Sequence, residues 1–376
     1  MISGALQAST KRGYPTCDGC WNVENRFRVD SKQGNMQKLR IAVIGLGSDW
    51  QHRYLPALRS LRDRFGVVGV YHSVSALAAA AARELDSVGY DSFRSLISNP
   101  SVEAILMLED DWYQLQPLWV ACEAQKGIFC GSEVDIQGMS SSGLQEAISS
   151  SGIPFMSGFS RRYAPATLRF KELIATRLGR PRLLFCHRRL PSEPPDPANS
   201  ISLEKQTNRE LLELIDWCTY IVDEEPDWIQ AIRHLSRPSP TNADYQILSL
   251  GFGEPETDPN AILAQISCGA YIPSVWAEAI AFRPPAAVQV CCEKGLVFID
   301  LPSTLVWFDD AGRHQETLDT ELPIGQQMLI QFHRAVSSKV SLVSDLQETN
   351  EAIRILEKAK LSTQTHQRVS LRDGIL

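Results

Sequence analysis

Two glycines, Gly45 and Gly47, lie between an apolar run and a segment with the apolar spacing of a helix. The run, Leu39 to Ile44, is of the kind buried on both faces of a parallel sheet. Glycines at such a turn let the backbone approach a diphosphate at the helix N-terminus. The third glycine of the usual G-x-G-x-x-G spacing is replaced by Trp50. The turn therefore predicts a dinucleotide site whose helix begins differently or lies farther from its strand. A glycine turn that binds nothing is the alternative.

The end of the second predicted strand bears on which dinucleotide binds. NAD-specific sites usually have an acidic residue there for the ribose 2′-hydroxyl, whereas this chain has His72 and Ser73. Because these two side chains tolerate a 2′-phosphate better than a carboxylate does, they favour NADP over NAD. The alternative is that His72 only caps the strand. We expect NADP or NAD as the cofactor.

Three adjacent carboxylates, Glu109 to Asp111, follow a strand at the sheet edge where ligands bind in such folds. Three acids together would repel a dinucleotide, so we interpret them as a turn rather than a cation site. Trp112 and Tyr113 beside them either stack on a ring or fill a domain interface. We expect no metal site.

Alternating strands and helices position these residues. The expected order is strand 39–44, helix 54–61, strand 67–71, helix 76–85, strand 104–108, helix 117–126, strand 128–130, helix 142–150 and strand 154–156. Such alternation predicts a parallel, doubly wound sheet with helices on both faces, a Rossmann domain over residues 38–160.

In residues 161–376 strands and helices no longer alternate. Helices at 165–178 and 205–223 precede β-type runs at 243–250, 261–271, 275–282, 287–299 and 303–308, and helices at 326–336 and 347–361 close the chain. Consecutive strands without intervening helices mean antiparallel pairing. We therefore predict an α/β protein whose C-terminal α+β domain has a large, mostly antiparallel sheet with helices on one face.

Composition excludes several classes of protein. The 376 residues carry a net charge of -7 without long like-charge runs, which argues against a nucleic-acid partner. No apolar stretch approaches the roughly 18 residues of a membrane span, and the first residues lack a secretory signal, so we expect a cytoplasmic protein. The nine cysteines favour reduced thiols over a disulfide framework.

Residues 1–37 show neither a helical nor an alternating period, and we interpret them as a disordered tail. Met36 just before the first strand suggests that translation starts there. Cys17 and Cys20 have the spacing of half a zinc site, but no second pair of ligands follows at the required distance.

From residue 38 to 371 the order of several short motifs resembles the glucose-fructose oxidoreductase and myo-inositol dehydrogenase (Gfo/Idh/MocA) family. The matching motifs are IAVIGLG from Ile41, Leu55 to Leu58, Asp91 to Ile97, Val102 to Ile105, Gly158 to Pro165, Lys294-Gly295, Phe332 to Ala335 and Ser344 to Leu346. The resemblance implies a Rossmann domain and a second domain whose sheet forms one wall of the substrate cleft. It also implies a homo-oligomer formed through that sheet.

The catalytic positions of this family differ here. Its members usually carry Glu-Lys-Pro after the strand that corresponds to residues 128–130, and the lysine helps to move the substrate hydroxyl proton. The matching stretch here is Gly131-Ser132-Glu133, and serine has neither the charge nor the proton affinity of lysine. A second signature, an Asp and a His one helical turn apart, falls on Arg209 and Glu213. The chain thus resembles a divergent member without the usual lysine and histidine.

Two functions remain open. In the first, the protein is an NAD(P)-dependent oxidoreductase that transfers hydride to or from a small sugar-, inositol- or bilin-like substrate. Glu213, Tyr163 or Glu133 would then be the acid or base, and Arg162 or Arg209 would hold an anionic substrate. In the second, the protein binds a dinucleotide or sugar without turnover, as a sensor or partner. The predicted cofactor-binding residues are Gly45, Gly47, Ser48, His72, Ser73, Leu108, Ser132 and Arg162.

Overall fold

The computed structural model describes residues 38–139, 143–192, 197–234, 245–254, 256–273, 275–276, 278–279, 287–338 and 343–372. The predictions for the tail, for a start at Met36 and for Cys17 and Cys20 lie outside the described residues.

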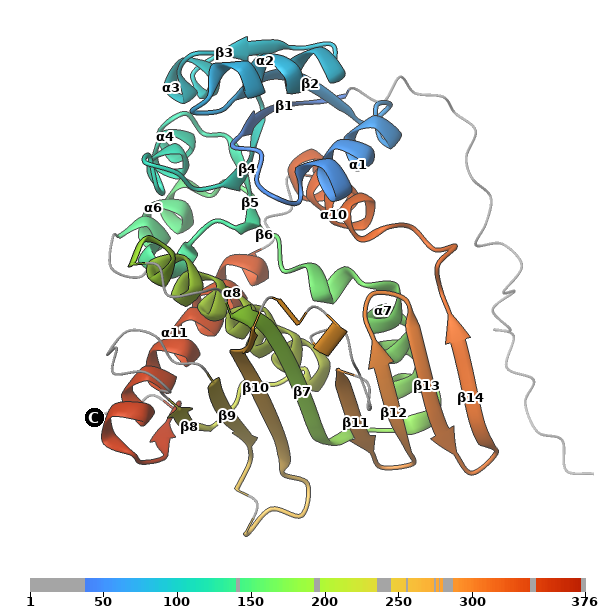
Figure 1. The fold of residues 1–376 in the computed structure, drawn as a ribbon. Coiled ribbons are helices and arrows are strands. Elements are labelled where there is room, and N and C mark those ends of the chain that lie inside the picture. Colours follow the sequence, from blue (N-terminus) through green and yellow to red (C-terminus); the bar gives the residue numbers. More distant parts are fainter. Residues whose placement is uncertain are drawn as a thin grey trace, which may run out of the picture. The chain divides into compact units, whose positions relative to one another are not determined.

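The first sheet is the parallel sheet that the sequence predicts (Figure 1). Its six strands are β1 (Leu39–Ile44), β2 (Phe65–Tyr71), β3 (Val88–Tyr90), β4 (Ala104–Glu109), β5 (Gly127–Glu133) and β6 (Phe155–Ser157), in the order β3-β2-β1-β4-β5-β6. The order reverses between β1 and β4, and ligands of such folds bind beyond the carboxyl ends of the strands at that point.

Helices cover both faces of this sheet, because the side chains of β1 alternate between two apolar clusters. Ile41 and Val43 pack in one with residues of α1 (Leu55–Ser60) and α10 (Ile324–Ser338), two helices that lie side by side in Figure 1. Ala42 and Ile44 pack in the other with residues of α3, α4 and α6. These last helices are Phe93–Ile97, Gln116–Glu123 and Leu144–Ser151, and α2 spans Ser75–Glu84.

The second sheet has nine strands in the order β14-β13-β12-β11-β7-β10-β9-β8-β15. They are β7 (Pro181–Ser192), β8 (Trp228–His234), β9 (Tyr245–Phe252), β10 (Ile262–Pro273), β11 (Val288–Cys292), β12 (Gly295–Asp300), β13 (Thr304–Asp309), β14 (Gly312–Thr317) and β15 (Val369–Ser370). The pairing of β7 with β10 is parallel and the other pairings are antiparallel, which confirms the predicted class of sheet.

Several elements differ from the prediction. The run at 287–299 is two strands joined by a tight turn, and strands β7, β8, β14 and β15 were not expected. In the run at 275–282, residues 275–276 and 278–279 are described and are not in a strand. Strand β3 and helix α3 were missed because they are short and β3 is largely exposed, so neither has a continuous apolar period.

Helices α7 (Pro165–Leu173), α8 (Pro197–Val222) and α11 (Val343–Thr365) pack against the second sheet. Along β7, Leu184 and Cys186 are buried whereas Leu183 and Phe185 are exposed, so one face of the sheet is covered. Both sheets belong to one compact unit, and a domain boundary at residues 160 and 161 stays a prediction.

None of the helices in the described ranges is both long and apolar enough to span a membrane. The described cysteines are free thiols, and all except Cys291 are buried. A cytoplasmic location stays a prediction.

Candidate functional site

The turn after β1 gathers backbone N–H groups at one place. Gly45 and Gly47 have φ values of +68° and +65°, in the left-handed region that favours glycine. The amides of Leu46 and Gly47 donate to one oxygen of Glu109, at 3.4 and 3.1 Å. The amide of Ser48 donates to Glu133 at 2.8 Å. Consecutive N–H groups of this kind form an anion-binding concavity, and here two carboxylates of the chain itself are the anions.

The sheet places these two carboxylates. Glu109 ends β4 and Glu133 ends β5, and the two residues are partners in the parallel register. Because β4 lies next to β1, both side chains reach the turn from the carboxyl edge of the sheet. A β-carbon on Gly47 would lie 2.5 Å from a carboxylate oxygen of Glu133. The Ser48 hydroxyl donates a second, short hydrogen bond to Glu133.

The helix after the turn begins differently from the usual motif, as the tryptophan at position 50 predicts. Trp50–Tyr54 form a turn of π-helix before α1 begins at Leu55. Trp50 is only 3% exposed and packs in the same apolar cluster as Tyr54 and Phe129. The tryptophan therefore fills core beneath the helix.

His72 and Ser73 lie beside the turn, and acidic residues engage both. His72 accepts a hydrogen bond from the Val74 amide at 2.9 Å through Nδ1, and its Nε2 lies 3.6 Å from Glu109. A hydrogen bond from Ser73 lowers the pKa of Asp111. The edge of the site near the end of β2 is therefore acidic, because the strand order brings Glu109 and Asp111 beside His72 and Ser73.

The aromatic residues after β4 have separate roles. Tyr113 is buried among Tyr71 and Phe93, and its hydroxyl donates to the Glu109 carbonyl at 3.2 Å. Trp112 is 70% exposed. Tyr113 therefore belongs to the core, whereas Trp112 presents most of its ring to solvent.

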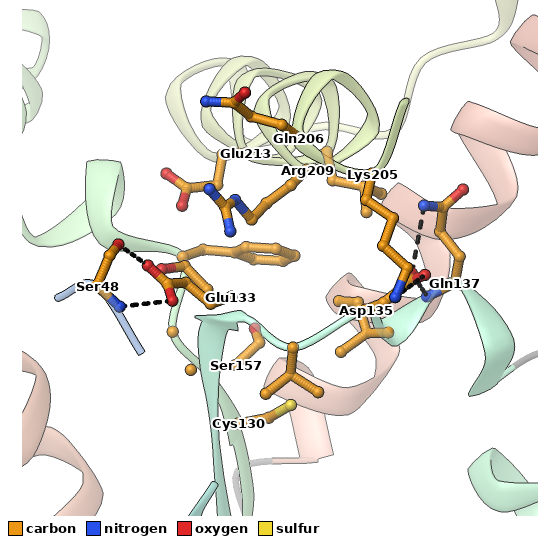
Figure 2. A pocket seen from close by; sticks show the side chains of 17 residues that line it. Ser48, Cys130, Glu133, Asp135, Gln137, Ser157, Lys205, Gln206, Arg209 and Glu213 are labelled. Atoms are coloured by element: carbon orange, nitrogen blue, oxygen red, sulfur yellow. Dashed lines mark hydrogen bonds and ion pairs between the residues drawn. The ribbon is translucent and has the colours of Figure 1, made fainter. Parts of the chain in front are cut away.

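A cavity of about 640 Å³ lies beside the turn, between the ends of β5 and β6 and helix α8 (Figure 2). Its lining includes Ser48, Ser132, Glu133, Asp135, Gln137, Ser157, Phe159, Lys205, Gln206, Arg209 and Glu213. The structure thus brings five of the predicted residues into the lining of one cavity: Ser48, Ser132, Glu133, Arg209 and Glu213. Ser48 connects this cavity to the glycine turn.

Glu213 is a buried carboxylate in the wall of this cavity, 8% exposed. Its Oε2 accepts hydrogen bonds from Arg161 at 2.6 Å and from Ser160 at 3.1 Å. Arg161 also donates to Glu210, one turn earlier on α8. Both of these bonds to Glu213 use the same oxygen, so among the described residues Oε1 is left for a ligand.

Arg209 lies on the cavity side of α8, one turn before Glu213 (Figure 2). Lys205, one further turn back, contacts Asp110 at 3.4 Å and Asp135 at 4.0 Å. Within the described ranges no ion pair engages Arg209, in contrast to Lys205. The guanidinium of Arg209 is therefore the cation of the cavity that can hold a ligand.

Apart from the residues at the glycine turn and at the end of β2, three more predicted residues lie outside the cavity lining. Arg162 is buried in ion pairs with Asp216 and Glu348. Tyr163 packs against the cluster that contains Trp50, and burial raises the pKa of its hydroxyl. The side chain of Leu108 is buried, and only its carbonyl approaches the turn, 3.0 Å from where a β-carbon on Gly47 would be. Roles for these residues stay predictions.

The cavity also contains polar side chains that the sequence motifs do not single out, chiefly Lys205, Gln206, Asp135 and Gln137. A signal for Lys205 existed, because residues 205, 209 and 213 are four apart and share one face of a helix. Glu109 was interpreted as part of a turn, and its bonds to the glycine turn depend on strand pairing that no local pattern encodes.

Comparisons with known proteins agree with this architecture. No family model matches the chain. Inositol 2-dehydrogenase of Streptomyces avermitilis is 24% identical over 310 residues, which cover 81% of this chain and 82% of that protein. Levoglucosan dehydrogenase, solved with NADH and levoglucosan, superposes with a TM-score of 0.72 at 17% identity, over 90% of this chain and 100% of that one. Aldose-aldose oxidoreductase of Caulobacter crescentus, solved with glycerol, also has a TM-score of 0.72, at 14% identity over 89% of this chain and 100% of that one.

These proteins are dehydrogenases of the Gfo/Idh/MocA type, so the resemblance drawn from the sequence motifs is confirmed. At these identities the structural likeness establishes the fold.

Proposed function

We propose that this chain, with the fold of the Gfo/Idh/MocA dehydrogenases, is an NAD-dependent oxidoreductase acting on a small sugar- or inositol-like substrate. The observation that carries the proposal is that the glycine turn and the polar cavity share Ser48 and Glu133. A dinucleotide on the turn would then end beside the cavity. The relatives support the same class, since they include an inositol dehydrogenase and a dehydrogenase solved with NADH and its sugar substrate.

The turn fits a diphosphate. Its amides donate to two carboxylates, whose oxygens stand in for those of a diphosphate. Bound at this place, the nicotinamide would exchange a hydride with a substrate carbon. We propose NAD rather than NADP because Glu109 and Asp111 lie against His72 and Ser73, where a 2′-phosphate would meet negative charge.

The residues of the cavity supply the remaining functions. Arg161 and Ser160 fix the orientation of Glu213 through Oε2, and Oε1 takes or gives the proton of a substrate hydroxyl. Arg209 holds an anionic or hydroxyl-rich part of the substrate. Ser132 contributes a hydrogen bond in place of the lysine of the family. The polar lining favours polyhydroxylated substrates over bilins.

The test is a fluorescence titration with NADH and NADPH, followed by a turnover screen over aldoses, uronates and inositols with NAD⁺. With a substrate in hand, Glu213→Gln should lower kcat by about a hundredfold or more, the range of a lost acid or base. Glu210→Gln is the matched control, because it also removes a partner of Arg161 but lies outside the cavity lining. An equal loss of kcat in both variants would contradict the role of Glu213.

A second candidate function is a non-catalytic sensor or partner that binds a dinucleotide or sugar. Ser132 at the lysine position favours it, since serine cannot shuttle a proton near neutral pH. Tight NADH binding with no turnover across the whole panel would support this function over the first.

A further inference from the structure

We infer that Glu109 and Glu133 form a carboxylate gate, an internal competitor for the diphosphate of the dinucleotide that sets both its affinity and its selectivity. The inference rests on the proposed function for the identity of the ligand. It goes further, because it assigns to two acidic side chains a control over binding that the glycine turn alone does not imply.

The gate satisfies the donors that a diphosphate needs. The amides of Leu46 and Gly47 point to Glu109, and the amide and hydroxyl of Ser48 point to Glu133. Because N–H groups of a turn can face only one anion at a time, a diphosphate and the two carboxylates exclude one another. Hydrogen bonds to an ionised carboxylate are among the stronger ones in proteins. Their loss therefore subtracts directly from the affinity for the dinucleotide.

Strand pairing and a contact with His72 also restrict the positions of the two glutamates. The two glutamates are paired in register on adjacent strands, so their backbones cannot drift apart independently. The imidazole of His72 lies 3.6 Å from the same oxygen of Glu109 that accepts from the turn. A 2′-phosphate placed near His72 would lie beside the carboxylate of Glu109, which repels it. The gate therefore disfavours NADPH more than NADH.

The gate can open without unfolding the sheet. The closest atom to a β-carbon placed on Gly47 would be a carboxylate oxygen of Glu133, the far end of a flexible side chain, at 2.5 Å. The side chain of Glu109 is 36% exposed. Rotation of both side chains toward solvent would clear the amides. Two negative charges would still lie near the diphosphate and weaken its binding.

The experiment measures dissociation constants for NADH, NADPH and ADP with the full chain and the variants Glu109→Gln, Glu133→Gln and the double variant. Glutamine keeps the size of the side chain and removes its charge. Each single change should tighten NADH and ADP about tenfold, or about 1.4 kcal/mol, and the double change should tighten them further. Glu103→Gln is the matched control. Glu103 directly precedes β4, the strand that Glu109 ends, and it pairs with Arg40 at the opposite edge of the sheet, away from the turn. It should leave all three constants unchanged.

The outcomes separate the gate from the proposed function. Tightening in the glutamine variants supports the gate even when the unaltered chain binds no NADH, and in that case the oxidoreductase proposal fails alone. Unchanged or weaker binding in the variants overturns the gate, whether or not the unaltered chain turns over a substrate. Glu133→Asp provides a second variant should the glutamine proteins unfold. Its shorter side chain releases Ser48, so it should also tighten ADP, and no change would again overturn the inference.

Discussion

At the scale of single residues, the surroundings of each carboxylate decide its chemistry. Glu213 is fixed by an arginine and a serine with one oxygen left for a ligand, whereas Asp216 is held by Arg162 away from the cavity. The same kind of group thus gives a candidate acid or base at one place and a structural ion pair at another.

Asp345 illustrates the cost of burying an acid. Its pKa is raised to about 7, chiefly by burial, with Arg162 opposing the rise and the acids Glu348 and Asp216 adding to it. An acid whose pKa is higher in the folded than in the unfolded chain destabilises the fold as it ionises. Stability should therefore fall as the pH rises from about 4 to about 7 and level off above that.

Asp345→Asn removes this ionisation. We expect it to raise the free energy of unfolding at pH 8 by on the order of 1 kcal/mol, with little effect at pH 4. Urea denaturation at both pH values measures the difference. The exposed Asp310→Asn serves as the control, and an equal gain in both variants would contradict the explanation.

Arg209 gives a second prediction at this scale. If it holds an anionic part of the substrate, Arg209→Gln should raise KM for uronates about tenfold or more, and much less for neutral sugars, because a charged hydrogen bond is lost. Steady-state kinetics over matched pairs of sugars and their acids tests it. Arg188→Gln is the control, since Arg188 pairs with Glu210 outside the cavity lining.

At the scale of elements, the π-helical turn Trp50–Tyr54 replaces the close helix–strand contact that a third glycine would allow. The large indole lies in the apolar cluster under α1 and α10, so the start of the helix is set by packing. The same segment that weakens the sequence motif therefore also stabilises the fold.

Trp50→Ala should consequently lower the free energy of unfolding by about 3–5 kcal/mol, the usual range for a buried aromatic residue cut to alanine. Thermal and urea unfolding give the value. Trp112→Ala, at an indole that is 70% exposed, should change stability by well under about 1 kcal/mol. A small effect at position 50 would show that the core there closes around the gap.

At the scale of the whole molecule, helices cover one face of the second sheet, and within the described residues the other face carries partly exposed apolar side chains. Leu183, Phe185 and Phe308 are each partly exposed on its strands, and Phe298 packs edge-to-face against Phe308. An apolar sheet surface of this kind suits a second copy of the chain. We propose that the protein self-associates through it.

Phe185→Glu should shift the protein toward the monomer, because a charge in the centre of an apolar interface is left unpaired. Size-exclusion chromatography with light scattering measures the mass. Val88→Glu, at an exposed position on the edge of the first sheet, should leave it unchanged. A monomeric unaltered chain would rule out this interface.

The sequence by itself determined the fold class, the glycine turn and the altered helix start. These depend on local periods, on buried strands such as β1 and on the identity of single residues such as Trp50. The residues that it singled out at the family's catalytic positions, Ser132, Glu133, Arg209 and Glu213, line the cavity, and their roles stay predictions.

Only the tertiary structure decided what each of these groups contacts. The carboxylates that face the turn come from residues 62 and 85 positions away from their partners, and strand register brings them there. The same long-range packing turns Arg162 toward Asp216 and Glu348 and leaves Tyr163 partly buried outside the cavity lining. Local sequence patterns determine the position of a residue on its helix or strand. The contacts of its charged group are determined by elements that are distant in the sequence.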